Sequence, residues 1–391
     1  MPGRIVIFES YEAMGGIVSL WEDLAIRSEP NVFYEPALLI PAMKYLRQPG
    51  EEPFVVAIFD PHSYNRLLGL FPMVRYRAFR RMPFAHFGNW KHKHAFYCAP
   101  LVDRGSEGYC VEALFKGLRK KYPGVRTYRF ELLDTDSTLY ACLRDVARFS
   151  VYFRTGERAM LDTSQARGRS LFNSKDRSDL RRREKRFGEL GLGTVTYHYD
   201  EGNDEASRWA DEFLALEASG WKGQSGTAMG SSAGERSFFL EATRNLAASG
   251  RLRTTSMRLN GQVIAANCDF LAGDTCFGFK SAYDERHGSL SPGKLLHYRH
   301  AERLLDDLQV LRHDTCTASD NVMLNRMYPM RRNLATLLLS RKPSVASAAI
   351  RYIIPNFVVL KARLRRRTRQ LRAMVDGASA KIRKRRAERP T

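Results

Sequence analysis

The stretch LRTTSMRLNGQVIAANCDFLAGDTCFGFKSAYDERHGSLSPGK, residues 252–294, decides the fold of this chain. Its apolar and β-branched residues predict three successive strands, over 252–259, 262–271 and 275–283. Asn260 and Gly261, between the first two strands, are typical of a two-residue hairpin turn. Pro292 then opens a predicted helix over 292–308. We therefore expect an antiparallel meander that runs directly into a helix.

The turn that joins the meander to this helix reads Ser291-Pro-Gly293-Lys294. A serine can cap a helix, and a glycine lets a ligand approach the backbone closely. Because the first amides of a helix lack intrahelical partners, they form a phosphate site, to which Arg286 and Lys294 would add positive charge. The alternative is a well-capped helix that binds nothing.

On both sides of this stretch the hydrophobic pattern alternates between helices and strands. Beyond the central stretch, the second half adds predicted helices over 173–190, 204–218 and 234–249 and strands over 193–199, 309–314 and 334–339. The first half shows predicted strands over 54–60, 67–75, 127–133 and 151–161 and helices over 107–122 and 137–147. The sequence therefore predicts two α/β halves.

Composition limits the class of protein. The 391 residues are 44% hydrophobic, which excludes a disordered chain, and the net charge of +21 favours polyanionic partners. Six scattered cysteines contain no CxxC pair, so we expect free thiols in a reducing cytoplasm and no metal site. Without an apolar run of about 18 residues, no membrane-spanning helix is expected.

The last part of the chain, 344–391, has a different character. Residues 361–391 contain 13 basic and 2 acidic side chains. Just before them, five apolar residues share one helical face, at Ile350, Ile353, Ile354, Phe357 and Val358. This combination predicts an amphipathic, polybasic segment on an anionic membrane surface. The alternative is a helix docked on the protein before a disordered tail. Nucleic acid is not expected, because no stacking aromatic follows Phe357.

The meander, the 291–294 turn and the spacing Asn321-x6-Tyr328 resemble the acetyl-CoA-binding core of the GNAT superfamily. Within it, the chain resembles the BioF2-like, CelD-like acetyltransferases, which are related to the FemAB peptidyltransferases. The matching segments are 21–25, 31–36, 180–183, 213–217, 220–223, the turn and His313-Asp314. The phosphate loop departs from the family pattern, because Gly288 and Ser291 stand where its first two motif residues belong.

This resemblance implies a mixed, largely antiparallel α/β fold of two tandem GNAT-like domains. We expect them over 1–160, without cofactor, and over 161–343, which would bind acetyl-CoA or a longer acyl-CoA. Arg286, Ser291, Gly293, Lys294 and Asn321 are the expected cofactor contacts.

We also expect a small set of catalytic and acceptor-binding residues. Tyr328 would protonate the leaving thiolate, and Asp314 would accept the acceptor's proton. Asp269 and His287 are lesser candidates. Trp221 and Lys222 would contact the acceptor.

The implied activity is transfer of an acyl group from CoA to an amine of a membrane lipid or of an envelope polysaccharide precursor. A sphingoid base, giving ceramide, is one concrete acceptor. We expect a cytoplasmic protein, bound peripherally at the inner face of the membrane. Two alternatives stay open. One is a FemAB-type aminoacyl transferase that uses charged tRNA, and the other is a non-catalytic scaffold with a degenerate site.

Overall fold

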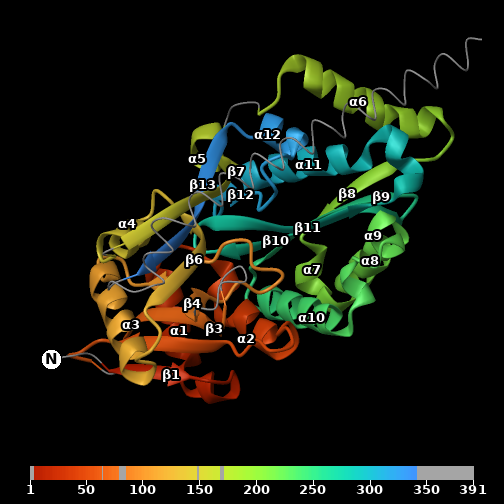
Figure 1. Cartoon of the computed structure of the whole chain (residues 1–391). Coiled ribbons are helices and arrows are strands. Elements are labelled where there is room, and N and C mark those ends of the chain that lie inside the picture. Colours follow the sequence, from red (N-terminus) through yellow and green to blue (C-terminus); the bar gives the residue numbers. More distant parts are fainter. Residues whose placement is uncertain (1–3, 64, 79–84, 148, 168–170, 341–391) are drawn as a thin grey trace, which may run out of the picture.

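The computed structural model describes residues 4–340, apart from 64, 79–84, 148 and 168–170 (Figure 1). Its strands are β1 (Ile5–Phe8), β2 (Phe54–Phe59), β3 (Leu67–Tyr76), β4 (His86–Asn89), β5 (Leu101–Val102), β6 (Thr127–Asp134), β7 (Phe149–Asp162), β8 (Val195–Tyr199), β9 (Leu252–Leu259), β10 (Gln262–Ala272), β11 (Thr275–Tyr283), β12 (Arg312–Asp314) and β13 (Met330–Ser340).

The α-helices are α1 (Val18–Arg27), α2 (Pro36–Tyr45), α3 (Glu107–Lys121), α4 (Thr138–Asp145), α5 (Thr163–Ala166), α6 (Ser174–Glu189), α7 (Glu201–Asp204), α8 (Ala206–Ser219), α9 (Trp221–Gln224), α10 (Ala233–Ala248), α11 (Pro292–Asp306) and α12 (Val322–Met327). The predicted segments therefore fold as expected, with boundary shifts of a few residues.

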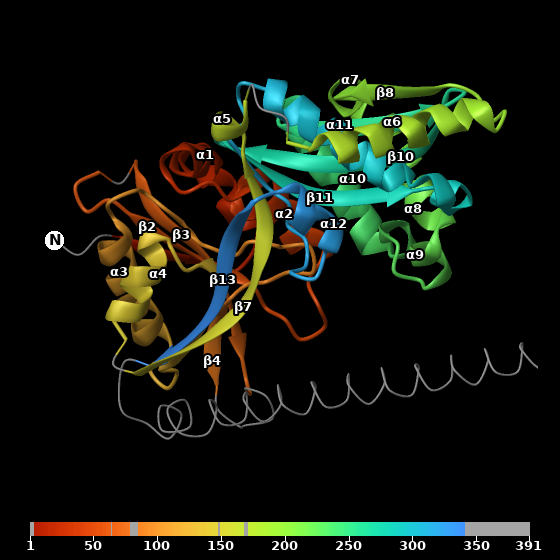
Figure 2. The same ribbon diagram turned by 90° about the horizontal axis from the view of Figure 1, so that it is seen from above.

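The described strands form one mixed sheet. Its order is β1-β2-β3-β4-β6-β13-β7-β12-β11-β10-β9-β8, and β5 pairs with β3 outside this path. Figure 2 shows β7 and β13 side by side between the two halves. β7 pairs with β12 of the second half, whereas β13 pairs with β6 of the first. Each half thus gives its last strand to the junction, next to the boundary expected near residue 160.

The two halves repeat one arrangement. In each, a three-stranded antiparallel meander is followed by a helix and a strand parallel to the meander's last strand. The parallel pairs are β4 with β6 and β11 with β12, and the helices between them are α3 and α11. Because a parallel connection needs a crossover, each helix packs across its own sheet. The structure therefore shows a repeat that has no counterpart in sequence periodicity.

Local sequence chemistry explains the turns. Asn260 and Gly261 both have positive φ, 49° and 82°, as a type I′ hairpin requires. Gly191, with φ of 68°, follows the end of α6. The cap of α6 is Asn173, whose side chain accepts from the Asp176 amide.

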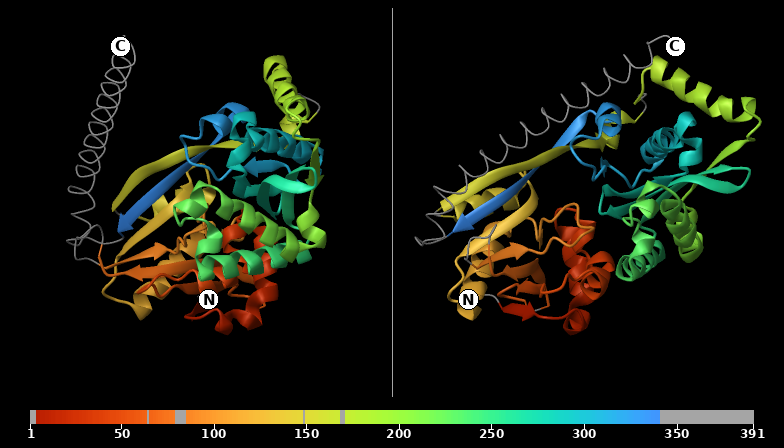
Figure 3. Two further views of the ribbon diagram at one scale, coloured as in Figure 1. Left: turned by 90° about the vertical axis from the view of Figure 1, so that its right-hand side faces the viewer. Right: turned by 45° about the vertical axis from the view of Figure 1, so that its right-hand side comes forward.

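Helices cover both faces of the second half's sheet. Phe213 of α8 and Phe238 of α10 pack on one face, in a core shared with the first half. Leu296 of α11 and Leu180 and Phe187 of α6 pack on the opposite face. Figure 3 shows α8 and α10 on one side of β9–β11 and α11 on the other. A ligand between β11 and β12 would therefore touch both layers.

Two expectations concern cysteines and membranes. All six cysteines are free thiols. Within the described residues, no helix is long and apolar enough to cross a membrane. The predicted amphipathic and polybasic segment, 344–391, lies outside the described residues.

Candidate active site

A wedge opens between the parallel strands β11 and β12. Their pairing ends at Phe277 and Asp314, and from Gly278 onward β11 is paired with β10 only. The backbones stay close here, since a Cβ on Gly278 would lie 2.7 Å from the Thr315 carbonyl oxygen. A cavity of about 110 Å³ fills the wedge, and its lining includes Gly278, His297, His313 and Asn321.

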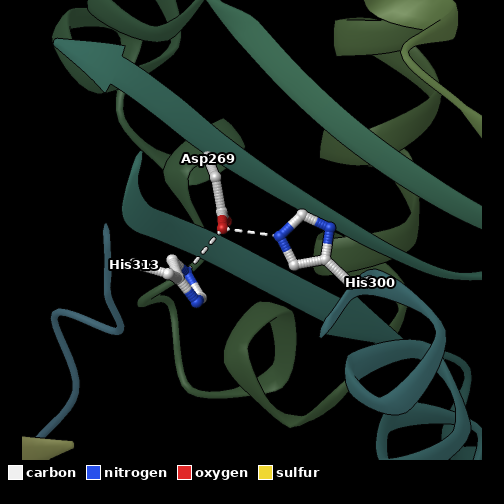
Figure 4. A group of neighbouring side chains, drawn as sticks. All are labelled: Asp269, His300 and His313. Carbon is white, nitrogen blue, oxygen red and sulfur yellow. Dashed lines mark hydrogen bonds and ion pairs between the residues drawn. The ribbon is translucent and has the colours of Figure 1, made fainter. Parts of the chain in front are cut away.

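Two histidines share one aspartate at the wall of this wedge (Figure 4). The Oδ2 atom of Asp269, on β10, lies 2.8 Å from Nε2 of His300 on α11 and 2.9 Å from Nε2 of His313 on β12. Nδ1 of His300 lies 2.9 Å from the Thr255 hydroxyl. Burial alone would raise the pKa of Asp269, but His300 and His313 outweigh it, and the pKa is well below its usual range.

His313 is the member of this group that can exchange a proton with a ligand. Its Nε2 atom lies 2.9 Å from Oδ2 of Asp269, and neither ring nitrogen has a hydrogen-bond partner among the described residues, so Nδ1 is open to a ligand. His313 also lines the cavity, together with Asp269. This arrangement orients one imidazole by a carboxylate, as general-base sites require.

Tyr328 stands behind His313. The two rings meet edge to face, with centroids 5.6 Å apart, and the buried tyrosine hydroxyl has no partner among the described residues. Burial, followed by the charge of Asp269, raises the pKa of Tyr328 well above its usual range. The hydroxyl therefore stays protonated at neutral pH and can donate a hydrogen bond. It does not line the cavity.

Helix α11 connects the wedge to the 291–294 turn. Gly293 lies in its first turn, His297 one turn later, about 6 Å along the axis, and His300 in the turn after that. Burial lowers the pKa of His297 to about 4, and His300 adds to this effect, so His297 is neutral at pH 7.

Helix α6 lies over the start of α11. Ser291 has a left-handed backbone with φ of 56°, and its hydroxyl accepts from Arg183 at 3.0 Å instead of capping the helix. Asp179 holds Nζ of Lys294 at 3.2 Å and Nε of Arg183 at 2.9 Å. Two cations therefore flank the start of α11, with one carboxylate as their shared counter-ion, while the Lys294 and Leu295 amides donate to the Ser291 carbonyl oxygen.

The structure gives the other expected residues different surroundings. Arg286 lies in the 3-10 helix Glu285–Leu290, with its side chain 83% exposed and paired with Asp284. Asp314 is fully buried between Arg158, at 2.7 Å, and Arg332, at 2.8 Å. Burial would raise the pKa of Asp314, but these two arginines lower it below the usual value. A carboxylate held in this way is a poor base.

Three further expected residues lie around the wedge. Asn321 lines the cavity and caps α12, accepting from the Leu324 amide at 3.0 Å. Lys222 binds Glu217 at 2.8 Å and the Ser281 carbonyl oxygen at 3.2 Å. The Trp221 side chain is 56% exposed, and its amide donates to Glu285.

The sequence did not reveal that two histidines contact one aspartate at this site. His297 and His300 have a helical spacing on α11, and His313 lies on the next strand, but spacing alone does not show that they converge on Asp269. His-Asp-His is also a ligand set for divalent metals, and the three ligand atoms lie within 4.8 Å of one another. A larger cavity of about 790 Å³, beside Phe172 and Tyr298, contains none of the expected site residues.

Comparisons with known proteins identify a domain and the fold. Residues 174–320 match the family described as acetyltransferase (GNAT) domain. A conserved protein of unknown function from Bacteroides thetaiotaomicron is 12% identical with a TM-score of 0.54, over 86% of this chain and 100% of that chain. The C-terminal domain of a putative lysylphosphatidylglycerol synthetase from Agrobacterium fabrum is 11% identical with a TM-score of 0.53, over 86% and 95%.

The structure of FemX is 9% identical with a TM-score of 0.51, over 83% of this chain and 96% of that one. No curated protein sequence matches the chain significantly. These likenesses in fold confirm the expected mixed α/β architecture of GNAT-like halves. The matched domain includes α6, the meander and the turn. It also includes the group formed by Asp269, His300 and His313, which we call the relay. Residues 174–320 therefore match a GNAT acetyltransferase domain, and the fold of the chain is similar to those of FemX and of the lysylphosphatidylglycerol synthetase domain.

Proposed function

We propose that this protein is an N-acyltransferase that moves an acyl group from a CoA thioester to an amine in the wedge between β11 and β12. The observation that carries the proposal is the placement, along α11, of an anion-binding helix start, a neutral histidine and one member of the Asp269 relay. The wedge lies beside this helix, so a donor bound at the turn would direct its thioester toward His313.

The donor would bind first through its pyrophosphate. The positive end of α11 and the Gly293 amide would favour an anion, and Lys294 and Arg183 would exchange Asp179 for phosphate oxygens. The pantetheine arm would then follow the unpaired edge of β11 past Asn321. Such placement makes acyl transfer effectively intramolecular.

The transfer needs one base and one group at the leaving sulfur. Nδ1 of His313 would take a proton from the acceptor ammonium, while Asp269 stabilises the resulting imidazolium. The free amine would attack the thioester carbon, its nitrogen would release the second proton to solvent, and the intermediate would collapse with cleavage of the carbon–sulfur bond. The proton on His313 would return to the thiolate. Tyr328 would assist by hydrogen bonding as the sulfur departs. We thus assign to His313 and Asp269 the role expected of Asp314.

The first half lacks the corresponding donor site. Helix α3, which corresponds to α11, begins with Glu107, whose carboxylate accepts from the Gly105 amide. A carboxylate at that helix start would repel a pyrophosphate. This supports a division of labour in which only the second half binds the donor.

The acceptor is proposed to be an amine of a membrane lipid, such as a sphingoid base, or of an envelope polysaccharide precursor. The support is the basic, amphipathic sequence of 344–391, which suits an anionic membrane surface. Truncation after 343 should abolish binding to anionic vesicles, and rising salt should weaken binding of the intact chain. Intact protein that ignores such vesicles at low salt would overturn peripheral membrane binding.

Donor binding is tested by thermal unfolding with acetyl-CoA, a long-chain acyl-CoA or a charged tRNA. A ligand at 100 times its Kd adds about 2.7 kcal/mol of stability. Gly293→Asp should weaken CoA binding more than tenfold, because it places a carboxylate at the phosphate site. Gly124→Asp is the control, since it faces open space in the first half. Stabilisation by tRNA alone would favour the FemAB-type alternative, and stabilisation by neither would favour a scaffold.

A further inference from the structure

Beneath β11, on the face covered by α8 and α10, three lysines surround two carboxylates. Lys93 pairs with Glu235 of α10, and Lys222 pairs with Glu217 of α8 at 2.8 Å. Lys280 of β11 is the third lysine. We call Lys93, Lys222 and Lys280 the lysine cluster. The first half supplies Lys93, so the cluster exists only when the two halves are together.

The strand register places Lys280 on this face. Lys280 pairs with Cys268, and the ladder shifts between Cys268 and Asp269, so that Asp269 pairs with Gly278. The side chain of Cys268 packs in the core with Phe213 and Phe238, beneath α8 and α10. Asp269 lies on the other face, with His300 of α11. The irregularity in β11 thus separates Lys280 from the relay by the thickness of the sheet.

Lys280 is left without a counter-ion. Glu217 is held by Lys222 and by the Met229 amide, while Glu235 is held by Lys93 and His94. No described residue forms a hydrogen bond or ion pair with Lys280. Its Nζ atom lies 5.9 Å from the centroid of the Phe279 ring.

The electrostatic surroundings of Lys280 also favour binding of an anion. Burial lowers the pKa of Lys280 despite Glu217 and Glu235, and Lys222 and Lys93 add to this decrease. His94 adds no charge at neutral pH, because burial, with Lys280 and Lys93, lowers its pKa to about 3. A partly buried ammonium in excess over its carboxylates is unfavourable until an anion arrives.

The cavity in the wedge connects this cation to the reaction. Lys280 and His313 both line it, although they belong to opposite faces of the sheet. The proposed donor approaches along α11, on the side of His313. Lys280 therefore faces the cavity from the side of α8 and α10, away from the proposed path of the donor, so it could contact an acceptor whose amine reaches the same wedge.

We propose that Lys280 binds an oxyanion, a phosphate or carboxylate, that the acceptor carries close to its reacting amine. This inference rests on the proposed function and narrows its acceptor to an amine with a neighbouring anionic group. A phosphorylated amino lipid or an anionic sugar precursor has this chemistry, whereas a neutral sphingoid base lacks it. Lys222 and Lys93 strengthen the positive potential at the site.

The test uses the intact wild-type protein and needs no knowledge of the acceptor. Lys280 is acetylated with limiting acetic anhydride, and its modification rate is measured by peptide mass spectrometry. Matched probes are added with CoA present: phosphoethanolamine against ethanolamine, and sphinganine 1-phosphate against sphinganine. Inorganic phosphate is a separate arm. Lys116, exposed on α3 in the first half, is the internal control.

We expect at least one phosphorylated amine to slow modification of Lys280 several-fold more than its neutral partner does, with Lys116 unchanged. Equal protection by both members of each pair, or no protection, would overturn the proposal. Protection by inorganic phosphate alone would overturn it too, because the anion would then be independent of the acceptor. Binding of CoA is measured in the same samples by thermal shift, so a failed donor site is distinguished from a failed acceptor subsite.

A second arm uses turnover with a matched acceptor pair. Lys280→Met should lower kcat/KM for the phosphorylated acceptor about 10- to 100-fold relative to the neutral one, as expected for a charged hydrogen bond. Lys116→Met should leave both values unchanged. An equal loss with both acceptors would show that Lys280 acts on the shared thioester, which contradicts the proposal.

Discussion

Gly278 is the narrowest point of the wedge, and replacing it with alanine is the sharpest test of the site's geometry. The added Cβ would lie 2.7 Å from the carbonyl oxygen of Thr315 and 3.1 Å from its carbonyl carbon. Both atoms are backbone, so no side chain can rotate away. The end of β12 would have to move by roughly 0.5 Å or more to restore ordinary contact.

The cost follows from this displacement. Overpacking of this kind costs about 1–3 kcal/mol, and the lower entropy of alanine in the unfolded chain returns about 0.4–1 kcal/mol. We expect a net loss of about 1–2 kcal/mol, or a decrease in Tm of roughly 1–3 °C. Because the same movement shifts Thr315 and Cys316 at the cavity wall, CoA should also bind more weakly.

The assay is thermal unfolding with and without saturating CoA. Gly124→Ala is the matched control, since its Cβ meets nothing within 4 Å and it lies in the first half, away from the wedge. The control should keep both the Tm and the shift caused by CoA. A Gly278→Ala protein with wild-type Tm and a wild-type CoA shift would refute the idea that β11 and β12 hold the donor between them.

Three further predictions address the relay and the buried histidines. His313→Gln should lower kcat by about 10²-fold or more with little change in CoA binding, whereas the exposed His198→Gln should have no effect; equal turnover in both variants would exclude His313 as the base. Dialysis against a chelator should change neither Tm nor kcat, because the hydrogen bond with His300 and the close contact with His313 already engage Oδ2 of Asp269. Loss of activity restored by zinc would assign the group to a metal. Stability should fall as pH decreases from about 6.5 toward 3, because burial lowers the pKa of His92 to about 3, so that in this range the unfolded chain binds a proton that the folded chain does not. His92→Leu should flatten this slope in unfolding titrations, and an unchanged slope would refute the assignment.

Local sequence was sufficient for most of the secondary structure. The meander, the hairpin at Asn260 and Gly261, and the start of α11 at Pro292 depend on residues that are close in the chain. Strands β4 and β5 were not predicted, because they are only four and two residues long, too short for a period of two to be distinct.

The candidate site divides in the same way. The sequence indicated the 291–294 turn, because capping and proline signals are local. It could not indicate that the Asp314 carboxylate is paired with two arginines, since Arg158 and Arg332 come from the two strands at the junction, β7 and β13. Nor could it show that Arg183 reaches Ser291, 108 residues away.

By itself, the sequence determined the two α/β halves, the hairpin, the phosphate-type turn and the basic character of the chain, because each depends on composition or on neighbours along the chain. Tertiary structure alone decided which charges meet. Asp269, His300 and His313 come from a strand, a helix and another strand. Only the packing of α11 and β12 beside β10 places both imidazoles within 3 Å of the Asp269 carboxylate. The excess charge at Lys280 has the same origin, since a pairing irregularity turns it toward α8 and α10. The energy of an ion pair falls as the distance between its charges grows. Its partners are therefore set by packing and not by separation in sequence.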